Sequence, residues 1–154
     1  VGEHHRPDFA ISAPEVVLAA IAGKTERMFL GSAVTVLSTD DPVRVFQRFS
    51  TLDALSNGRA EVILGRGSFT ESYPLFGYDL SQYNALFEEK LDVFVTLHDQ
   101  KPVTWSGRTR SGLTNQVVYP QVLKALSKVV EGTPRVGTAV VSNSTLHKIA
   151  ARAA

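Results

Sequence analysis

Two adjacent histidines follow a carboxylate in the run Glu3-His4-His5, and all three residue types can do chemistry. An imidazole can move protons near neutral pH, and it can also ligate a metal ion. Successive side chains of a strand point to opposite faces, so only one of His4 and His5 can face a pocket if Gly2–His5 ends a strand, with Glu3 opposite it. Adjacent histidines rarely hold one ion together, and no carboxylates from other strands can be identified as partners. We therefore predict no metal site, and favour acid–base or hydrogen-bonding work over a purely structural pair.

A second candidate cluster is Gly65-Arg66-Gly67-Ser68, which follows an apolar run. Two glycines let the backbone approach a ligand closely, and an arginine there suits a phosphate or another anion. The run lacks the full dinucleotide fingerprint, no Walker sequence is present, and an arginine in a turn is usually a solvated charge. In Ser32-Ala33-Val34-Thr35 the small residues could make space for a flat ring, although such a run is ordinarily core.

The elements that must position these residues alternate between strands and helices. Apolar spacing and capping signals predict helices at 14–22, 42–55 and 84–98, strands at 28–37 and 60–64 and a long loop at 69–83. Residues 100–120 are polar and are expected to form a surface hairpin or an extended insertion. Ser12 is the expected cap of the first helix, and Asp40 or Asp41 that of the second. Weaker patterns suggest a helix at 122–130, a strand at 136–141 and a helix at 146–153. This alternation predicts an α/β protein, either an open doubly wound sheet or a barrel.

Composition narrows the class of protein. The 154 residues are enough for one domain, and a hydrophobic content of 44% with 20% charged residues is typical of a soluble globular chain. The 16 basic and 15 acidic residues nearly balance, so neither nucleic acid nor a membrane surface is the expected partner. There is no cysteine, which excludes disulfides and thiolate sites, and no apolar run of spanning length or signal peptide is visible. We expect a cytoplasmic protein.

Several of these stretches together resemble the bacterial luciferase-like flavin monooxygenase family. The matching runs are GEHHRPDF (2–9), APEVVLAAIAGKT (13–25), LGSAVTVL (30–37), DDPVRVFQRFSTLDALSNGRAEVILGRG (40–67), FGYDL (76–80) and FEEKLDVF (87–94). The resemblance implies a (β/α)8 TIM barrel with flavin at the carboxyl ends of the strands. Residues 1–120 resemble part of such a barrel, which is more than twice as long, and residues 121–154 form a less recognisable remainder in one domain of 1–154. We therefore expect only a partial set of the strand–helix units. Either the chain is a fragment, or residues are omitted from the sequence.

The resemblance also assigns roles. His4 corresponds to a histidine with acid–base work at the flavin, whereas His5 is expected to be structural. Glu3 would lie beside the flavin ring, and Ala33 and Val34 would back the ring, where relatives carry a non-proline cis peptide. Arg66, with Gly67 next to it, corresponds to an arginine near the flavin phosphate or ring edge. Gly132-Thr133-Pro134 is similar to a phosphate-binding turn of the family.

The function implied by the resemblance is a monooxygenase that uses reduced FMN and O2. The alternatives are an oxidoreductase dependent on the deazaflavin F420, or a non-catalytic flavin-binding relative. The implied partners are a small-molecule substrate of undetermined identity, a flavin reductase that supplies reduced flavin, and a second copy of the chain, bound through the helices at 14–22 and 42–55.

Overall fold

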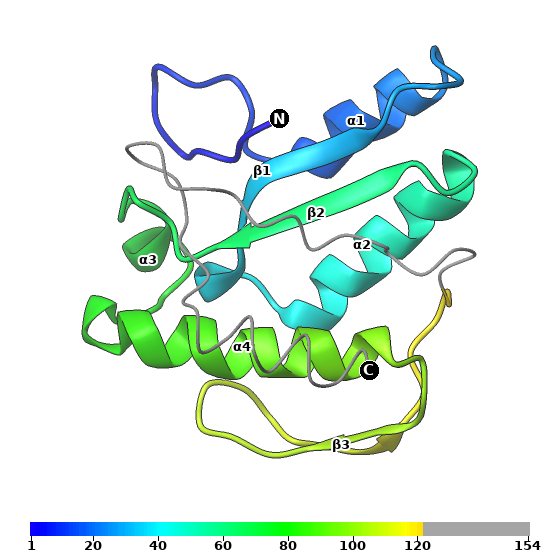
Figure 1. Ribbon diagram of the computed structural model, residues 1–154. Helices are drawn as coiled ribbons and strands as arrows, with labels where there is room; N and C mark the ends of the chain where they lie inside the picture. Colours follow the sequence, from blue (N-terminus) through cyan, green and yellow to red (C-terminus); the bar gives the residue numbers. More distant parts are fainter. Residues whose placement is uncertain (122–154) are drawn as a thin grey trace.

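The computed structural model describes residues 1–121 of the chain. The patterns at 122–130, 136–141 and 146–153, and the Gly-Thr-Pro run, lie outside the described residues. The elements are, in order, α1 (Pro14–Ala22), β1 (Leu30–Val36), the 3-10 turn η1 (Leu37–Thr39), α2 (Pro42–Leu55), β2 (Ala60–Gly65), α3 (Ser72–Leu75), η2 (Leu80–Gln82), α4 (Tyr83–His98), β3 (Val103–Trp105) and β4 (Leu113–Gln116). The predicted alternation of strands and helices is confirmed (Figure 1).

Two parallel strands form the frame of the molecule. β1 pairs with β2 from Leu30↔Ala60 to Val36↔Gly65, and α2 makes the crossover between them. The amino-terminal segment lies along β1, because the Val1 nitrogen donates to Gly31 O at 2.8 Å and Ala33 N donates to Val1 O at 2.7 Å. The structure assigns no regular strand to Gly2–His5, so the condition under which the strand alternation was considered is not met. The chain turns away from β1 after its first residues, because the His4 amide donates a hydrogen bond to Ile11 O and not to β1.

Apolar side chains between the strands and helices make the core. α1 packs on β1 and α2, and α2 packs on β2 and α4 (Figure 1). Phe46 of α2 meets Phe94 of α4 edge to face, with ring centroids 6.1 Å apart, and both are buried with Phe49 and Leu91. The predicted apolar stripe of residues 42–55 supplies most of this contact, because its spacing places these side chains on one helix face.

One of the two predicted helix caps is found in the structure. Asp41 caps α2 as expected, accepting from Val43 N at 2.9 Å and Arg44 N at 3.3 Å. Ser12 does not cap α1. The capping position is Ala13, without a side-chain hydrogen bond, and the start signals that remain are Pro14 and the acidic Glu15 in the first turn.

Two further boundaries differ from the predictions. The predicted loop at 69–83 contains α3 and η2. The strand predicted from position 28 begins at Leu30, and the side chains of Met28 and Phe29 are exposed. These two apolar side chains are therefore not part of the core in the described part of the chain.

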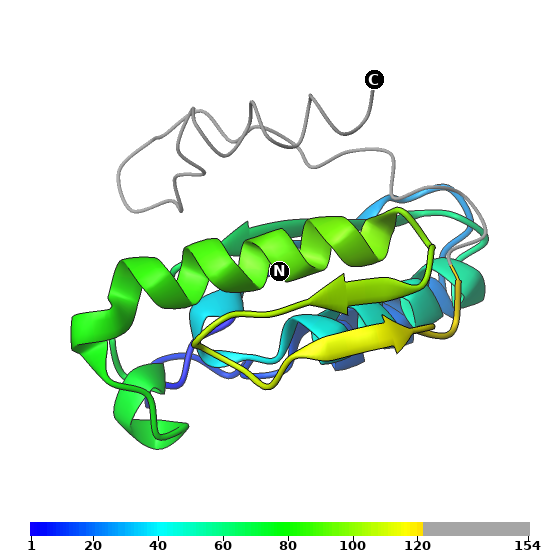
Figure 2. The same ribbon diagram turned by 90° about the horizontal axis from the view of Figure 1, so that it is seen from below.

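The predicted hairpin is confirmed as antiparallel β3 and β4, which lie alongside α4 (Figure 2). Trp105 Nε1 donates to Asp92 Oδ2 at 3.1 Å, and Glu89 Oε2 accepts from Arg108 N at 2.8 Å and Thr109 N at 3.0 Å. Burial opposes ionisation of Glu89, but these hydrogen bonds outweigh it and lower the pKa of its carboxyl. In the part of the chain that the structure describes, no helix is long and apolar enough to cross a membrane.

Candidate active site

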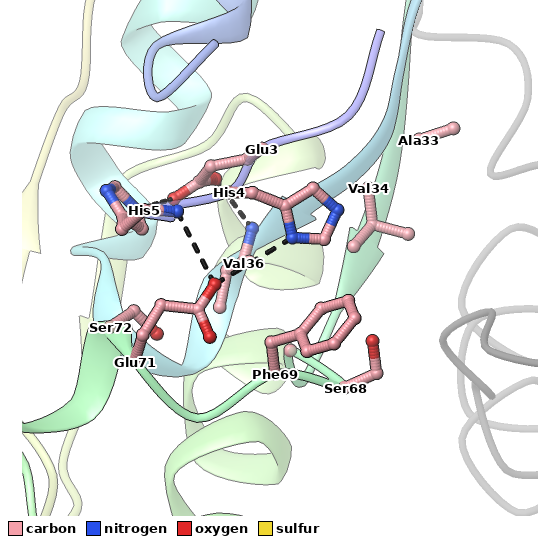
Figure 3. A pocket seen from close by; sticks show the side chains of 11 residues that line it. Glu3, His4, His5, Ala33, Val34, Val36, Ser68, Phe69, Glu71 and Ser72 are labelled. Carbon is pink, nitrogen blue, oxygen red and sulfur yellow. Dashed lines mark hydrogen bonds and ion pairs between the residues drawn. The ribbon is translucent and has the colours of Figure 1, made fainter. Parts of the chain in front are cut away.

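A pocket opens where the carboxyl ends of β1 and β2 meet the amino-terminal segment and the loop that leads to α3 (Figure 3). The residues that line it are Glu3, His4, His5, Ala33, Val34, Val36, Gly67, Ser68, Phe69, Glu71 and Ser72. The pocket therefore brings together every predicted site residue except Arg66. Its place agrees with the rule that ligands bind at the carboxyl ends of parallel strands.

Glu3 is buried and joins the amino-terminal segment to the end of β1. Its Oε2 accepts from Val36 N at 2.8 Å, and its Oε1 lies 3.0 Å from His5 Nε2. The His5 ring also meets Phe76 edge to face, with centroids 5.0 Å apart. Glu3 and His5 thus point the same way and form a hydrogen-bonded pair, as the strand alternation predicts for residues two apart.

His4 points to the opposite side and presents its ring to the pocket (Figure 3). The ring lies between Phe9, at a centroid distance of 4.0 Å, and Phe69, at 5.2 Å. His4 Nδ1 is 3.8 Å from Glu71 Oε1, and the other edge of the ring turns toward Val34. The side chain is 23% exposed, so the imidazole can exchange a proton with a bound molecule while its faces stay covered.

One wall of the pocket is formed by small side chains and by backbone. The Ala33–Val34 peptide is cis, as the resemblance implied, and the pairing register with β2 shifts between Ala33 and Thr35. Ala33 is exposed and Val34 is half-buried, so this part of the predicted two-sided core faces the pocket instead. At Gly2 a Cβ would lie 3.1 Å from Ala33 O, so a larger residue would press on this wall.

Gly67 is one of the residues that line the pocket. Its φ of +83° is a conformation that L residues rarely adopt, and a Cβ there would lie 2.9 Å from Val36 Cγ1. Glycine is therefore required both by the turn and by the close approach to β1. The predicted role of this glycine in bringing backbone near a ligand is compatible with its position in the pocket lining.

Arg66 is turned away from the pocket toward α4. Its guanidinium lies 4.4 Å from the ring centroid of Phe87 and 3.7 Å from Glu88 Oε1. The turn that carries it is held by two tyrosine hydroxyls, since Tyr73 donates to Arg66 O and Tyr83 donates to Gly67 O, each at 3.0 Å. Cofactor binding by Arg66 stays a prediction that this arrangement does not support.

Three pocket residues beyond the Gly65–Ser68 cluster, Phe69, Glu71 and Ser72, were not singled out in the sequence. Ser72 Oγ is buried and has no hydrogen-bond partner among the residues that the structure describes. The only local signal for these residues is that they follow the carboxyl end of a parallel strand. Within residues 1–121, no group of three or more His, Asp or Glu side chains is arranged to hold a metal ion.

These features fit a flat aromatic cofactor ring. The Ala33–Val34 wall offers a surface without aromatic or long side chains, Ser72 Oγ offers an unused hydrogen-bonding group, and His4 offers an exchangeable proton in the same pocket lining. A planar, partly polar ring needs this combination of an apolar face and a few convergent polar groups.

Comparison with known proteins identifies the family. The family model described as luciferase-like monooxygenase matches residues 1–154. A limonene 1,2-monooxygenase of Rhodococcus erythropolis is 35% identical over 138 residues, which is 86% of this chain and 35% of that protein. This chain therefore belongs to the luciferase-like monooxygenase family, as the resemblance indicated.

Solved structures agree with the fold. A monooxygenase of Streptomyces bottropensis matches with a TM-score of 0.73 at 23% identity, over 81% of this chain and 38% of that one. An F420-dependent secondary alcohol dehydrogenase matches with a TM-score of 0.68 at 26% identity, over 80% and 40%. The chain thus corresponds to part of a luciferase-like TIM barrel, and spans well under half the length of these relatives.

Proposed function

We propose that the protein is a flavin-dependent monooxygenase that uses reduced FMN and O2 to oxygenate a small-molecule substrate. The observation that carries this proposal is the placement of the His4 ring beside the cis Ala33–Val34 wall at the carboxyl ends of the strands. Membership of the luciferase-like family supports it, as does similarity to proteins named monooxygenases.

Several residues of the site have roles in this proposal. Bound reduced flavin supplies the electrons that activate O2. Ala33 and Val34 support the face of the ring, and His4 holds or moves a proton at the nitrogen turned toward Val34. Phe9 and Phe69 cover the imidazole and limit access of water to it. Glu3 acts indirectly, because its carboxylate is occupied by Val36 N and His5.

An F420-dependent oxidoreductase is the second candidate. The observation that favours it is the likeness to the F420-dependent alcohol dehydrogenase, at 26% identity and a TM-score of 0.68. A pocket wall of small side chains is compatible with either ring system. The two proposals differ in chemistry, since F420 transfers hydride whereas reduced FMN reacts with O2.

The test is replacement of His4 combined with cofactor titration. We expect His4→Ala to lower turnover with reduced FMN by about 10²–10⁴-fold, because a positioned acid–base group contributes that much. The dissociation constant for FMN should change little, since the ring is held mainly by the wall. Turnover is measured by substrate-dependent O2 consumption, and binding by flavin fluorescence, each with FMN and with F420.

His98→Gln is the matched control, because His98 ends α4 and does not line the pocket. Wild-type turnover in His4→Ala would overturn the role of His4. Tight binding of F420 with hydride transfer, and no O2-dependent reaction with FMN, would replace the first proposal by the second. FMN binding without turnover in the wild-type protein would indicate a non-catalytic flavin-binding relative.

The proposed partners follow from the same reaction. An enzyme that consumes reduced FMN needs a supply of it, so we propose a separate flavin reductase as donor. We also propose a cytoplasmic homodimer formed through α1 and α2, on which Val16 and Leu55 expose large apolar side chains. Neither nucleic acid nor a membrane has a part in this proposal.

A further inference from the structure

We propose that Glu71 is a positioning residue for His4, which keeps the imidazole proton on Nδ1 so that Nε2 is the atom that accepts a proton in the pocket. The inference rests on the proposed function for the role of His4 in turnover. The orientation of the ring is a separate claim and can be measured without any reaction.

The carboxylate of Glu71 lies near one nitrogen of the His4 ring. Glu71 directly precedes α3, and its Oε1 lies 3.8 Å from His4 Nδ1 (Figure 3). The same oxygen accepts from His5 N at 3.4 Å. A carboxylate placed against one ring nitrogen favours the tautomer that carries its proton there. Catalytic hydrogen bonds are often long before a ligand binds, so the distance is compatible with a bond in the complex.

Two phenylalanine rings restrict rotation of the His4 imidazole. Phe9 and Phe69 cover the imidazole of His4, at centroid distances of 4.0 Å and 5.2 Å. A Cβ placed on Gly2 would lie 4.0 Å from His4 Nε2, so this nitrogen faces the segment beside the Ala33–Val34 wall. The two nitrogens therefore have different surroundings, one acidic and one open to the pocket.

The other charged side chains near His4 are paired with one another or with other groups. Arg6 and Asp8 form a two-point ion pair, with both nitrogen–oxygen distances 2.9 Å, and the guanidinium stacks 4.6 Å from the ring centroid of Phe69. These two charges largely offset each other. Glu3 is engaged by His5 and Val36 on the opposite side. Among residues 1–121, Glu71 is the acidic side chain within ion-pair distance of the His4 ring.

The direct test is nitrogen-15 NMR of the histidine side chains, at a pH at which the rings are neutral. The signals of His4 are assigned by their loss in His4→Gln. We expect the wild-type protein to carry the proton on Nδ1. Glu71→Ala should move it mainly to Nε2, whereas Glu71→Gln should keep it on Nδ1, because the amide oxygen can still accept.

Glu26→Gln is the matched control for removal of one negative charge, since Glu26 is exposed and lies before β1, away from the pocket. It should leave the His4 spectrum unchanged. An unchanged tautomer in Glu71→Ala would overturn the inference, as would an equal change in Glu26→Gln.

A double-mutant cycle separates positioning from a structural role. We expect Glu71→Ala to lower kcat roughly 10- to 100-fold with little change in KM, and Glu71→Gln to recover most of the loss. In the His4→Gln background, Glu71→Ala should cost nothing further. Full additivity would overturn the inference. If the tautomer shifts as expected but His4→Gln keeps wild-type turnover, the orientation of His4 by Glu71 holds and the proposed function fails.

Discussion

Lys90 is a charged residue enclosed by the fold. Its side chain is 1% exposed, and Nζ donates to Ser38 O at 2.7 Å and lies 3.9 Å from the ring centroid of Tyr78. Burial lowers the pKa of Lys90 to about 8, because it disfavours the ammonium, while the carboxylates of Asp40 and Asp41 oppose the shift. The residue therefore loses its proton in the native protein at a pH where the unfolded chain still keeps it.

We expect the free energy of unfolding to rise between about pH 8 and about pH 10, because the pKa of Lys90 is lower in the native protein than in the unfolded chain. In that window the unfolded chain binds more protons than the native one, so the free energy of unfolding increases by up to about 1.4 kcal/mol per pH unit. Lys90→Met should flatten the rise. Urea unfolding at several pH values measures both slopes.

Two tyrosines limit that window. Burial raises the pKa of Tyr73 and Tyr78, so their ionisation belongs to higher pH and acts in the opposite direction. An equally steep rise in Lys90→Met would show that Lys90 is not its source.

At the scale of elements, Arg59 holds together the amino ends of the two parallel strands. Its guanidinium donates to Ser56 O at 2.7 Å, Met28 O at 2.7 Å, Thr25 O at 2.8 Å and Ala22 O at 3.2 Å. These carbonyls close α1, α2 and the turn into β1. The planar fork of arginine suits such a convergent set of acceptors, whereas a lysine presents a single point charge.

We expect Arg59→Ala to lower the free energy of unfolding by about 2–4 kcal/mol, since several carbonyls lose a charged donor together. Arg59→Lys should recover only part of the loss. Arg27→Ala, at an exposed position of the same turn, serves as control and should cost about 0.5 kcal/mol or less. The measurement is chemical unfolding monitored by circular dichroism. Equal losses of unfolding free energy in Arg59→Ala and Arg27→Ala would contradict the stabilising role of the Arg59 hydrogen bonds.

At the scale of the whole molecule, the outer face of α1 and α2 is the feature that bears on assembly. A groove between the helices is lined by residues of both and by Tyr119 and Pro120. Val16, Leu55 and Tyr119 are 69%, 67% and 66% exposed there. Apolar side chains gathered on one face are typical of protein interfaces.

We expect the protein to be a homodimer and the pair of changes Val16→Lys and Leu55→Lys to shift it to monomer, because like charges would face each other across the interface. Sedimentation equilibrium gives the mass of each variant. Met28→Lys, at another exposed apolar position, should leave the mass unchanged. A monomeric wild-type protein, or a dimer that tolerates both lysines, would place this prediction in error.

Much of the fold was determined by the sequence alone, because its signals are local. The apolar stripe of 42–55 and the Asp41-Pro42 start depend on spacing and capping within a few residues, and both helix and cap are found in the structure. The alternation of helices and strands predicted parallel pairing for the same reason. The period of two along a strand also separated His4 from its neighbours Glu3 and His5, even though the segment is not a regular strand.

Only the tertiary structure decided how the pocket is completed. Glu71 is 67 residues from His4 in the chain, and its approach depends on the register of β1 with β2 and on the turn after β2. Arg66, which the resemblance places near the flavin phosphate or ring edge, has its guanidinium 4.4 Å from the ring centroid of Phe87 in the structure. Glu3 accepts from Val36 N, which is 33 residues away in the chain. Long-range packing selects these rotamers and partners, and no local period in the sequence specifies them.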